Sequence, residues 1–416
     1  MGDSKFHSLD KNRKLSPINF EITEEHVKIG KRELLRRNIL GVHHEISKNP
    51  DDKFSFLKFF YYPLDLHPKR CITEKREIFL VAVFDKFKSR QENEEDAEKI
   101  LNSITRPKKK LFIIVNPFSG RKKGGKIADK LSKILVEAGI SNKLVKTTHG
   151  GHAEEIAKTE SFTGYDALVT VSGDGLVNEV INGLRQREKD DAPPVAPIPA
   201  GSGNGLVAFL VLKVAGKHSC LSKAIHALVL ASESDSDSHR IDLMKVVFNG
   251  SSRFSFLAIA TGLIADIDIN SERLRFLGGE LRNLIYGVAY ILRKRSYSIQ
   301  LSVEDKESEA GFISLVVAVC PMLDERVTFF PEIKSEPGMY LHQMHSSVTR
   351  AQLIKLWDLA EDGGKHVEVF PELANTSATS IRIKCAKKQL FTIDGEPFYS
   401  EEVLITEFKN ALKIFY

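Results

Sequence analysis

Two glycine-rich turns constrain the fold of this chain more than any other feature of its sequence. The first runs from Ser172 to Gly175 and the second from Gly201 to Gly205, and each lies between an apolar, strand-like run and a helical pattern. In an open α/β sheet such turns gather at the carboxyl ends of parallel strands, where backbone N–H groups can hold phosphate. The pair therefore predicts a protein that uses a nucleotide to transfer a phosphoryl group.

The segment around these turns alternates regularly between strand and helix patterns. Four apolar runs have the length of buried strands, and segments with a helical period follow them. Strands are expected at 111–115, 143–147, 166–171 and 195–199, with helices at 127–138, 151–158, 176–184 and 203–210. Repeated strand-then-helix units predict a doubly wound parallel sheet with right-handed crossovers.

Changes of pattern divide the chain into four parts. Residues 1–22 are polar and have no period, so we expect a mobile tail there. Residues 23–106 have the pattern of a small β-rich module, closed by a helix from Asn93 to Ile104. The nucleotide lobe is expected at 107–232, and after an acidic, serine-rich run a mostly antiparallel β lobe is expected at 239–416.

The last lobe is dominated by β patterns that two helices interrupt. Strands are expected at 240–248, 254–261, 297–303, 311–320, 366–370, 380–385 and 389–393, and helices at 279–293 and 349–361.

The composition fits a folded protein and excludes several other classes. With 42% hydrophobic and 28% charged residues among 416, global disorder is excluded. The apolar runs fall far short of the roughly 20 residues of a spanning helix, and no signal-peptide core is present. We therefore expect a cytoplasmic protein, at most peripheral to membranes. The net charge of +5 gives no support for nucleic-acid binding, and whether the chain forms a homodimer stays open.

Asp174, between the two glycines of the first turn, is the candidate catalytic base. Phosphoryl transfer requires positioning, acceptance of one proton and neutralisation of phosphate charge. Asp174 would lie at the carboxyl end of a strand, and the flanking Gly173 and Gly175 would let a substrate approach the backbone closely. The alternative is that Asp174 merely caps the helix that begins near Leu176.

Other polar residues at strand ends are candidates for nucleotide contact. In the second turn the amides of Gly201 and Gly203 can form an anion nest, to which Ser202 adds a side-chain donor. Asn116 and Thr147 come directly after the first two expected strands.

Two further patterns are set aside on chemical grounds. Gly120 to Lys126 fits the spacing GxxxxGK, but Ile127 stands where a P-loop needs a hydroxyl for magnesium, so a P-loop NTPase is rejected. His149 and His152 resemble a metal pair, but His and Gly at a turn more often serve packing and capping.

The second lobe offers candidates for binding a lipid. Asp266 and Asp268 would share one face of an extended segment and could bind a cationic head, although capping or exposure explains such pairs equally well. Arg275 and Arg282 are candidates to clamp phosphate. An apolar helical stripe after Leu281 would line a lipid tunnel, touch a membrane or pack as a core helix. The acidic turn at 394–397, taken alone, indicates a hairpin.

Taken together, these motifs resemble those of the diacylglycerol-kinase-like lipid kinases, and most of all the sphingosine kinases. The resemblance runs from about residue 40 to the end and rests on Asn116-Pro117, Gly151 to Ala153, Ser172 to Leu176, Glu179-Val180, Asn182-Gly183 and Pro199 to Asn204. Ser172, the segment 262–268 and the run from Phe391 to Glu396 favour the sphingosine kinase branch.

The resemblance implies an ATP-binding lobe followed by a β-sandwich lipid-binding lobe, with ATP and Mg²⁺ as cofactors. By position, Asp174 corresponds to the base that activates the primary hydroxyl, and Asp268 to the acid that pairs with the sphingoid amine, with Asp266 and Ile267 beside it. The nucleotide-binding residues are expected to be Asn116, Thr147, Ser172, Gly173, Gly175, Glu179, Gly201, Ser202, Gly203, Arg275, Arg282, Asp394, Gly395 and Glu396. Lipid and membrane contacts are expected from Leu284, Ile285 and Val288.

The resemblance therefore predicts ATP-dependent phosphorylation of sphingosine or a related long-chain base at its primary hydroxyl. The expected partners are a sphingoid-base lipid and a membrane surface. The alternatives are a kinase of the same fold that acts on ceramide, diacylglycerol or NAD, or a lipid-binding adaptor that has lost catalysis.

Overall fold

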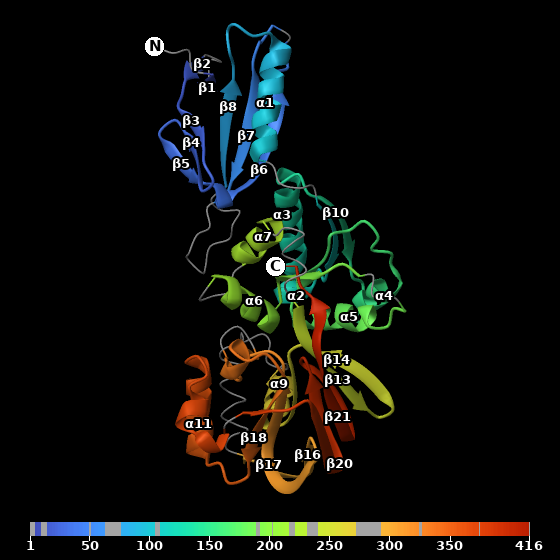
Figure 1. Cartoon of the computed structure of the whole chain (residues 1–416). Coiled ribbons are helices and arrows are strands. Elements are labelled where there is room, and N and C mark those ends of the chain that lie inside the picture. Colours follow the sequence, from blue (N-terminus) through green and yellow to red (C-terminus); the bar gives the residue numbers. More distant parts are fainter. Residues whose placement is uncertain are drawn as a thin grey trace.

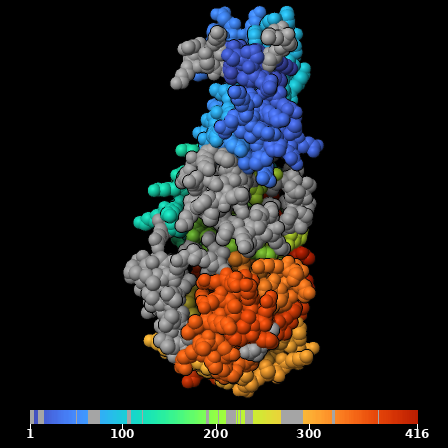
Figure 2. All heavy atoms as spheres, turned by 90° about the vertical axis from the view of Figure 1, so that its left-hand side faces the viewer, coloured from blue at the N-terminus to red at the C-terminus, as the bar shows by residue number. Residues whose placement is uncertain are grey.

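The structure is a computed structural model that describes residues 5–9, 15–49, 51–62, 76–104, 109–188, 192–201, 203–215, 221–230, 240–271, 293–323, 327–373 and 375–415. Three parts follow one another along the chain: a β-rich N-terminal module, an α/β lobe and a β lobe (Figure 1). The N-terminal module projects from one end of the molecule (Figure 2). Among the described residues, no helix is both long and apolar enough to cross a membrane.

The N-terminal module contains two antiparallel sheets and a helix. The larger sheet has the order β2 (Leu15–Pro17), β1 (Phe6–Leu9), β8 (Glu77–Val83), β7 (Ser55–Tyr61), β6 (Ile39–Ile46). The smaller sheet has the order β3 (Phe20–Ile22), β4 (His26–Ile29), β5 (Arg32–Leu35), which the 3₁₀ turn η1 (Arg36–Asn38) follows. Helix α1 (Arg90–Ile104) packs on strands β6, β7 and β8.

The prediction of a mobile tail through residue 22 is wrong for the described residues. β1 pairs with β8, and the ring of Phe6 lies 4.5 Å from that of Phe20, which in turn packs on Phe59. Strands of three or four residues are too short to show a period, so aromatic packing decides their place. Asn93 is not a cap: α1 begins at Arg90, and the buried Asn93 side chain accepts from the Asp85 N–H at 2.8 Å.

The α/β lobe contains the predicted parallel sheet. Its order is β10 (Ser141–Lys146), β9 (Lys110–Val115), β11 (Ala167–Ser172), β12 (Val195–Pro199), and every pair is parallel. The helices are α2 (Ser119–Lys122), α3 (Gly124–Glu137), α4 (His152–Thr159), α5 (Asp174–Leu184), α6 (Gly205–Ala215) and α7 (Leu221–Leu230).

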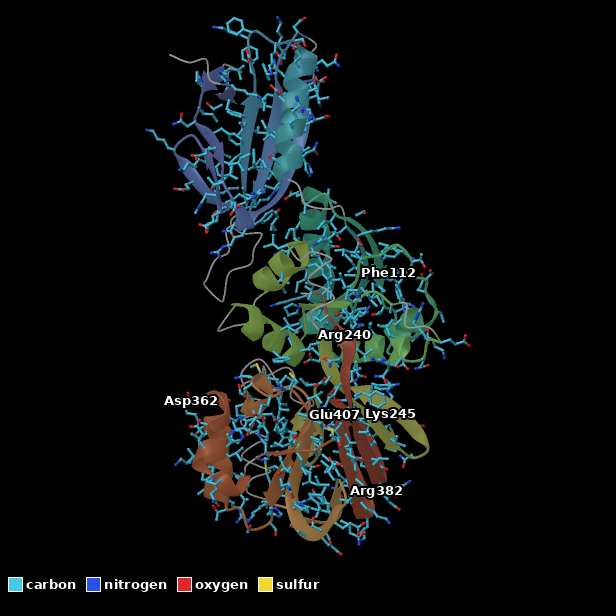
Figure 3. All side chains as sticks on the ribbon, in the orientation of Figure 1. Phe112, Arg240, Lys245, Asp362, Arg382 and Glu407 are labelled. Carbon is cyan, nitrogen blue, oxygen red and sulfur yellow. The ribbon has the colours of Figure 1, made fainter. Side chains whose placement is uncertain are left out.

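Alternate residues of each strand face opposite sides of this sheet. Ile113 and Val169 pack with α3 and α7 on one side. Phe112 packs with α4 and α5 on the other side (Figure 3). Phe112 meets Phe162 and Tyr165 edge to face, with ring centroids 5.1 and 5.3 Å apart. The doubly wound architecture therefore has one apolar layer on each face of the sheet.

Both ends of the chain contribute to the core of the α/β lobe. Leu40, Phe60 and Tyr62 of the N-terminal module are buried in the same apolar cluster as the face of the sheet that α3 covers. At the other end, Ile414 forms a parallel bridge to Val195, and Phe415 is buried in that cluster. The α/β lobe is thus completed by segments from outside it.

The β lobe is one antiparallel sheet that folds onto itself. Its path is β14 (Ser251–Ser255), β13 (Arg240–Phe248), β21 (Glu396–Lys413), β20 (Ser380–Ile393), β15 (Ala258–Gly262), β17 (Lys306–Ala318), β18 (Tyr340–His345), β19 (Thr376–Ser377). β16 (Tyr297–Val303) pairs with parts of β17 and β20 that β15 does not reach, which closes the sheet around an apolar core. The helical elements among the described residues of this lobe are α9 (Leu263–Ser271), η4 (Pro331–Lys334), α11 (Arg350–Glu361), α12 (His366–Val369) and η5 (Pro371–Leu373).

Three expectations for this lobe need correction. The alternating segment 366–370 is the short helix α12, whose His366 is buried beneath α11, rather than a strand. The expected strands 380–385 and 389–393 are one strand, β20, with a register shift between Lys384 and Gln389. The expected strand 254–261 breaks between β14 and β15, because the N–H groups of Phe256 and Leu257 donate to a side chain there.

The helix expected at 279–293 lies almost wholly outside the described residues. The boundaries at 106–107 and 232–239 also fall outside them, so the division into 107–232 and 239–416 stays a prediction.

Candidate active site

The two glycine-rich turns lie against each other at the carboxyl edge of the parallel sheet. The Ala200 N–H donates to the Ser172 carbonyl at 2.8 Å, and the Asp174 N–H donates to the Gly203 carbonyl at 3.2 Å. A Cβ on Gly201 would lie 2.5 Å from the Gly173 nitrogen, and one on Gly173 would lie 2.5 Å from the Gly203 oxygen. Only residues without a side chain allow this approach of backbone to backbone.

Gly201→Ala is expected to lower the free energy of unfolding by about 1–3 kcal/mol, the usual cost of overpacking a tight site. Gly125→Ala is the control, because its Cβ would meet only Pro117, at 3.8 Å. The comparison requires urea unfolding of both variants beside the parent protein. Equal midpoints for the two variants would mean that the turns are packed more loosely than described.

The Asp174 carboxylate is held by the first turn of a neighbouring helix. It accepts from the N–H of Gly205 at 2.7 Å and from that of Leu206 at 3.3 Å, both in α6. Helix α5 begins at Asp174, and its N-cap position is taken by Gly173, which has no side chain. Asp174 therefore does not cap its own helix. These two amides at the N-terminus of α6 fix the orientation of the carboxylate.

The other residues of this lobe that are expected to contact nucleotide lie at the same edge of the sheet, and they differ in the hydrogen bonds that they make within the protein. Asn116 follows β9, and its Oδ1 accepts from the Phe118 N–H at 2.9 Å. Thr147 follows β10 and is buried, with its hydroxyl 3.4 Å from the Val115 carbonyl. Glu179 accepts from the Ala153 N–H at 3.1 Å, which ties α5 to the first turn of α4. The side chains of Thr147 and Glu179 therefore have bonding roles within the lobe.

Asp266 and Asp268 do not share a face, contrary to expectation. They belong to helix α9, where residues two apart point about 200° away from each other. Asp266 accepts from the Tyr297 hydroxyl at 3.1 Å, and burial raises its pKa. Burial and the adjoining Asp266 charge raise the pKa of Tyr297 to about 12. Ile267 between them is buried in the core.

Asp268 lies beside the acidic turn at 394–395, and Glu396 lies beside the first glycine-rich turn, Ser172 to Gly175, which holds the candidate base and is called the catalytic turn below. Asp394 and Gly395 connect β20 to β21 with φ of +50° and +89°, the two-residue hairpin that favours Asp-Gly. A carboxylate oxygen of Asp268 lies 3.8 Å from the position a Cβ on Gly395 would take. A carboxylate oxygen of Glu396 lies 3.7 Å from the corresponding position on Gly175. Elements of both lobes therefore meet at the catalytic turn.

Asp394, expected to contact nucleotide, is instead buried. Its carboxylate accepts five hydrogen bonds from the chain, from Asn178, Ser255 and the amides that follow Ser255. Asn178 and Asn182 also hold Phe254 of the second lobe, with the Phe254 N–H donating to Asn182 at 2.8 Å. The site prediction missed these asparagines; their spacing of four, which places them on one side of the helix, was the available signal.

Ser202, Arg275, Arg282, Leu284, Ile285 and Val288 lie outside the described residues or at positions whose side chains are not described. Among the residues that are described, no group of three or more His, Cys, Asp or Glu could hold a metal ion. The two glycine turns and the carboxylates of Asp174 and Glu396 lie together at the carboxyl edge of the parallel sheet.

Comparison with known proteins identifies the family. The diacylglycerol kinase catalytic domain matches residues 110–246. Human sphingosine kinase 1 is 30% identical over 340 residues, which cover 71% of this chain and 87% of the human protein. Sphingosine kinase 1 of Arabidopsis thaliana is 38% identical over 201 residues, but the match spans only 40% of the plant protein.

A crystal structure of a diacylglycerol kinase from Bacillus anthracis has the same fold, with a TM-score of 0.55 at 18% identity over 75% of this chain and 98% of that one. The resemblance seen in the motifs is thus confirmed over 71% of this chain and 87% of the human protein. The chain belongs to the sphingosine kinase family, a branch of the diacylglycerol-kinase-like lipid kinases.

Proposed function

We propose that the protein transfers the γ-phosphoryl group of ATP to the primary hydroxyl of sphingosine or a related long-chain base, giving the 1-phosphate. The observation that carries this proposal is the placement of Asp174. Its carboxylate is oriented by the Gly205 and Leu206 amides between two glycine turns, and the second lobe meets the same turn through Glu396. Membership of the sphingosine kinase family supports the reaction class.

Asp174 acts as the base in this proposal. As the lipid oxygen forms its bond to the γ-phosphorus, the hydroxyl proton passes to the Asp174 carboxylate, and the bond from phosphorus to the bridging oxygen breaks to leave ADP. By resemblance, the glycine turns are proposed to hold the phosphates, and Asn116, Arg275 and Arg282 to complete the nucleotide site. Bound Mg²⁺ would supply charge neutralisation, and Glu396 is the carboxylate suited to hold it together with the phosphates.

The second lobe supplies the acceptor site. Asp268, at the turn that also presents Glu396, is proposed to pair with the protonated amine of the long-chain base. Asp266 serves the lobe instead, because its carboxylate bonds Tyr297. The apolar residues Leu284, Ile285 and Val288 are proposed, by resemblance, to contact lipid at a membrane surface.

The test of the proposed function is turnover of ATP with sphingosine, ceramide and diacylglycerol offered separately. Sphingosine should be phosphorylated at the highest kcat/KM, because ceramide and diacylglycerol have no amine for Asp268. Preference for either of the other lipids would assign the protein to another kinase of this fold. A well-folded protein that phosphorylates none of the three would be an adaptor.

Asp268→Ala is expected to raise the KM for sphingosine by roughly 10-fold or more, since a charge-assisted hydrogen bond contributes about 1.5–3 kcal/mol. The KM for ATP should change little. Asp305→Ala is the control, because it removes an exposed carboxylate from the turn between β16 and β17. An unchanged KM for sphingosine in Asp268→Ala would show that the amine binds elsewhere.

A further inference from the structure

We infer that Asp394 is a positioning residue that fixes the second lobe against the catalytic turn. The inference rests on the proposed function for its readout, and it assigns Asp394 a role other than contact with the nucleotide. Its basis is the geometry of one buried carboxylate between the two lobes.

Asp394 is a hub of hydrogen bonds. Its Oδ1 accepts from the Ser255 hydroxyl at 2.6 Å and from the N–H groups of Leu257 and Ala258 at 3.1 Å each. Its Oδ2 accepts from Asn178 Nδ2 at 2.7 Å and from the Phe256 N–H at 3.2 Å. Burial raises the pKa of Asp394, and the hydrogen bonds oppose that rise because each donor stabilises the carboxylate. Backbone N–H groups can only donate, so an ionised acceptor fits this site.

The Asp394 carboxylate is connected to the catalytic turn through helix α5. Asn178 lies four residues after Asp174, on the same side of the helix. α5 lies beside β14 where the two lobes meet (Figure 1). The Asn178 bond to Asp394 therefore fixes the rotation of the helix that begins with the base.

Asp394 is also connected, through Leu257, to the Gly205 amide that bonds Asp174. The Leu257 N–H donates to Asp394, and the Leu257 side chain lies against Gly205, where a Cβ would be 2.8 Å from it. The Gly205 N–H in turn donates to Asp174. Asp394 is thus connected to the catalytic carboxylate from two sides.

Asp394 also sets the position of the groups that the second lobe contributes to the site. Asp394 begins the two-residue turn that presents Gly395 to Asp268 and Glu396 to Gly175. Its own N–H donates to the Ala258 carbonyl at 2.9 Å, which anchors the turn to β15. Displacement of this turn would change the distance between the base and the groups of the second lobe without removing any of them.

The test is a double-mutant cycle with Asp394→Asn and Asn178→Asp. In Asp394→Asn, Oδ1 can keep its three donors, but the new amide nitrogen faces the Asn178 nitrogen. In Asn178→Asp, two carboxylates face each other. In the double variant the bond is restored with its direction reversed, because residue 394 now donates to residue 178. The Phe256 N–H is then left without its acceptor, and the Phe254 carbonyl loses the donor at residue 178 but keeps that of Asn182.

Each single variant is expected to lower kcat/KM for the lipid by roughly 10–100-fold, as a displacement of about 1 Å does. The double variant should recover to within about 5-fold of the parent protein. The Kd for ATP without lipid should change less than kcat/KM in all three, because the two glycine turns of the proposed nucleotide site lie within the first lobe, although Glu396 lies in the second. Asp305→Asn is the control for an exposed carboxyl-to-amide change, and Ser255→Ala, which removes one donor only, is the milder variant if Asp394→Asn folds poorly.

Three results would overturn the inference. They are unchanged kcat/KM in Asp394→Asn, no recovery in a folded double variant, or a loss of ATP affinity as large as the loss of kcat/KM. Coupling between positions 394 and 178 in urea unfolding is a readout without turnover, and its absence would also count against the inference. Failure of the proposed function can be told apart from failure of this inference, because the parent protein itself would then not phosphorylate sphingosine.

Discussion

Asp174→Asn is expected to lower kcat by about 10²–10⁴-fold, the usual contribution of a positioned general base. The amide cannot accept the hydroxyl proton, yet it has nearly the shape of the carboxylate. One of its atoms can still accept from the Gly205 N–H, while its nitrogen meets the Leu206 donor. A modest loss of stability should therefore accompany the large loss of turnover.

Asp166→Asn is the matched control for this variant. Asp166 precedes the same strand, β11, and its carboxylate accepts from the Lys110 N–H at 2.6 Å, at the opposite edge of the sheet. Both variants thus weaken a bond between a carboxylate and a backbone amide. Steady-state kinetics should show near-normal kcat for Asp166→Asn and ATP binding within a few-fold of normal for both. Near-normal turnover in Asp174→Asn would remove Asp174 from the role of base.

The second large effect is an acid-induced loss of stability in the β lobe. His342 on β18 and His366 on α12 are buried, with ring centroids 5.7 Å apart, and both pack on Phe329. His342 Nδ1 meets Asn375 at 2.8 Å, whereas its Nε2 has no hydrogen-bond partner among the described residues. Burial lowers the pKa of His342 to about 3 and that of His366 to about 4.

The sign of the pH dependence follows from these pKa values. Above about pH 6.5 both histidines are neutral in the folded and the unfolded chain, and their contribution to stability is complete. As the pH falls below 6.5, only the unfolded chain takes up protons, so the free energy of unfolding decreases. The decrease is about 1.4 kcal/mol per pH unit for each histidine, or about 4 kcal/mol for the pair at pH 5. Glu332, which bonds Asn375, is the acidic group closest to this pair through a described contact.

Urea unfolding at pH 7.5 and pH 5 measures this loss directly. The single tryptophan of the chain, Trp357, lies in α11 and packs against the apolar cluster that contains Phe329. Its fluorescence therefore reports on the β lobe. His366→Phe should reduce the decrease by about half, because one of two titrating groups is removed. His149→Phe, a half-exposed ring in the α/β lobe, should leave the decrease as it is. Equal stability of the parent protein at the two pH values would contradict buried, neutral histidines.

The α/β lobe was the part of the fold most open to prediction from the sequence. Buried parallel strands are continuous apolar runs, and the glycine turns mark where each strand passes into a helix, so Asp174 could be placed at the carboxyl edge. The interpretation of Asp266 and Asp268 as extended failed because two acidic residues are too few to define a period. The alternation at His366 to Phe370 misled in the same way, because burial beneath α11 outweighs a local pattern of five residues.

The contacts between the lobes could not be predicted from local patterns. Asp394 and Asn178 are 216 residues apart, and neither neighbourhood indicates the other. Asp394 shares its turn with Glu396, so position in a motif alone suggested a nucleotide contact for both. The structure shows that the Asp394 carboxylate is enclosed between the lobes, whereas the Glu396 carboxylate lies beside the catalytic turn.

The apolar cluster shared by the N-terminal module, the α/β lobe and the end of the chain has a practical consequence. A fragment cut to the family match at 110–246 would lose the buried side chains of Leu40, Phe60, Tyr62 and Phe415 together. It would remove part of the apolar cover from the side of the sheet on which α3 and α7 pack, and it would release the bridge from Ile414 to Val195. The segment that matches the diacylglycerol kinase catalytic domain is therefore not a unit of folding by itself, and useful expression fragments retain both the N-terminal module and the last strand.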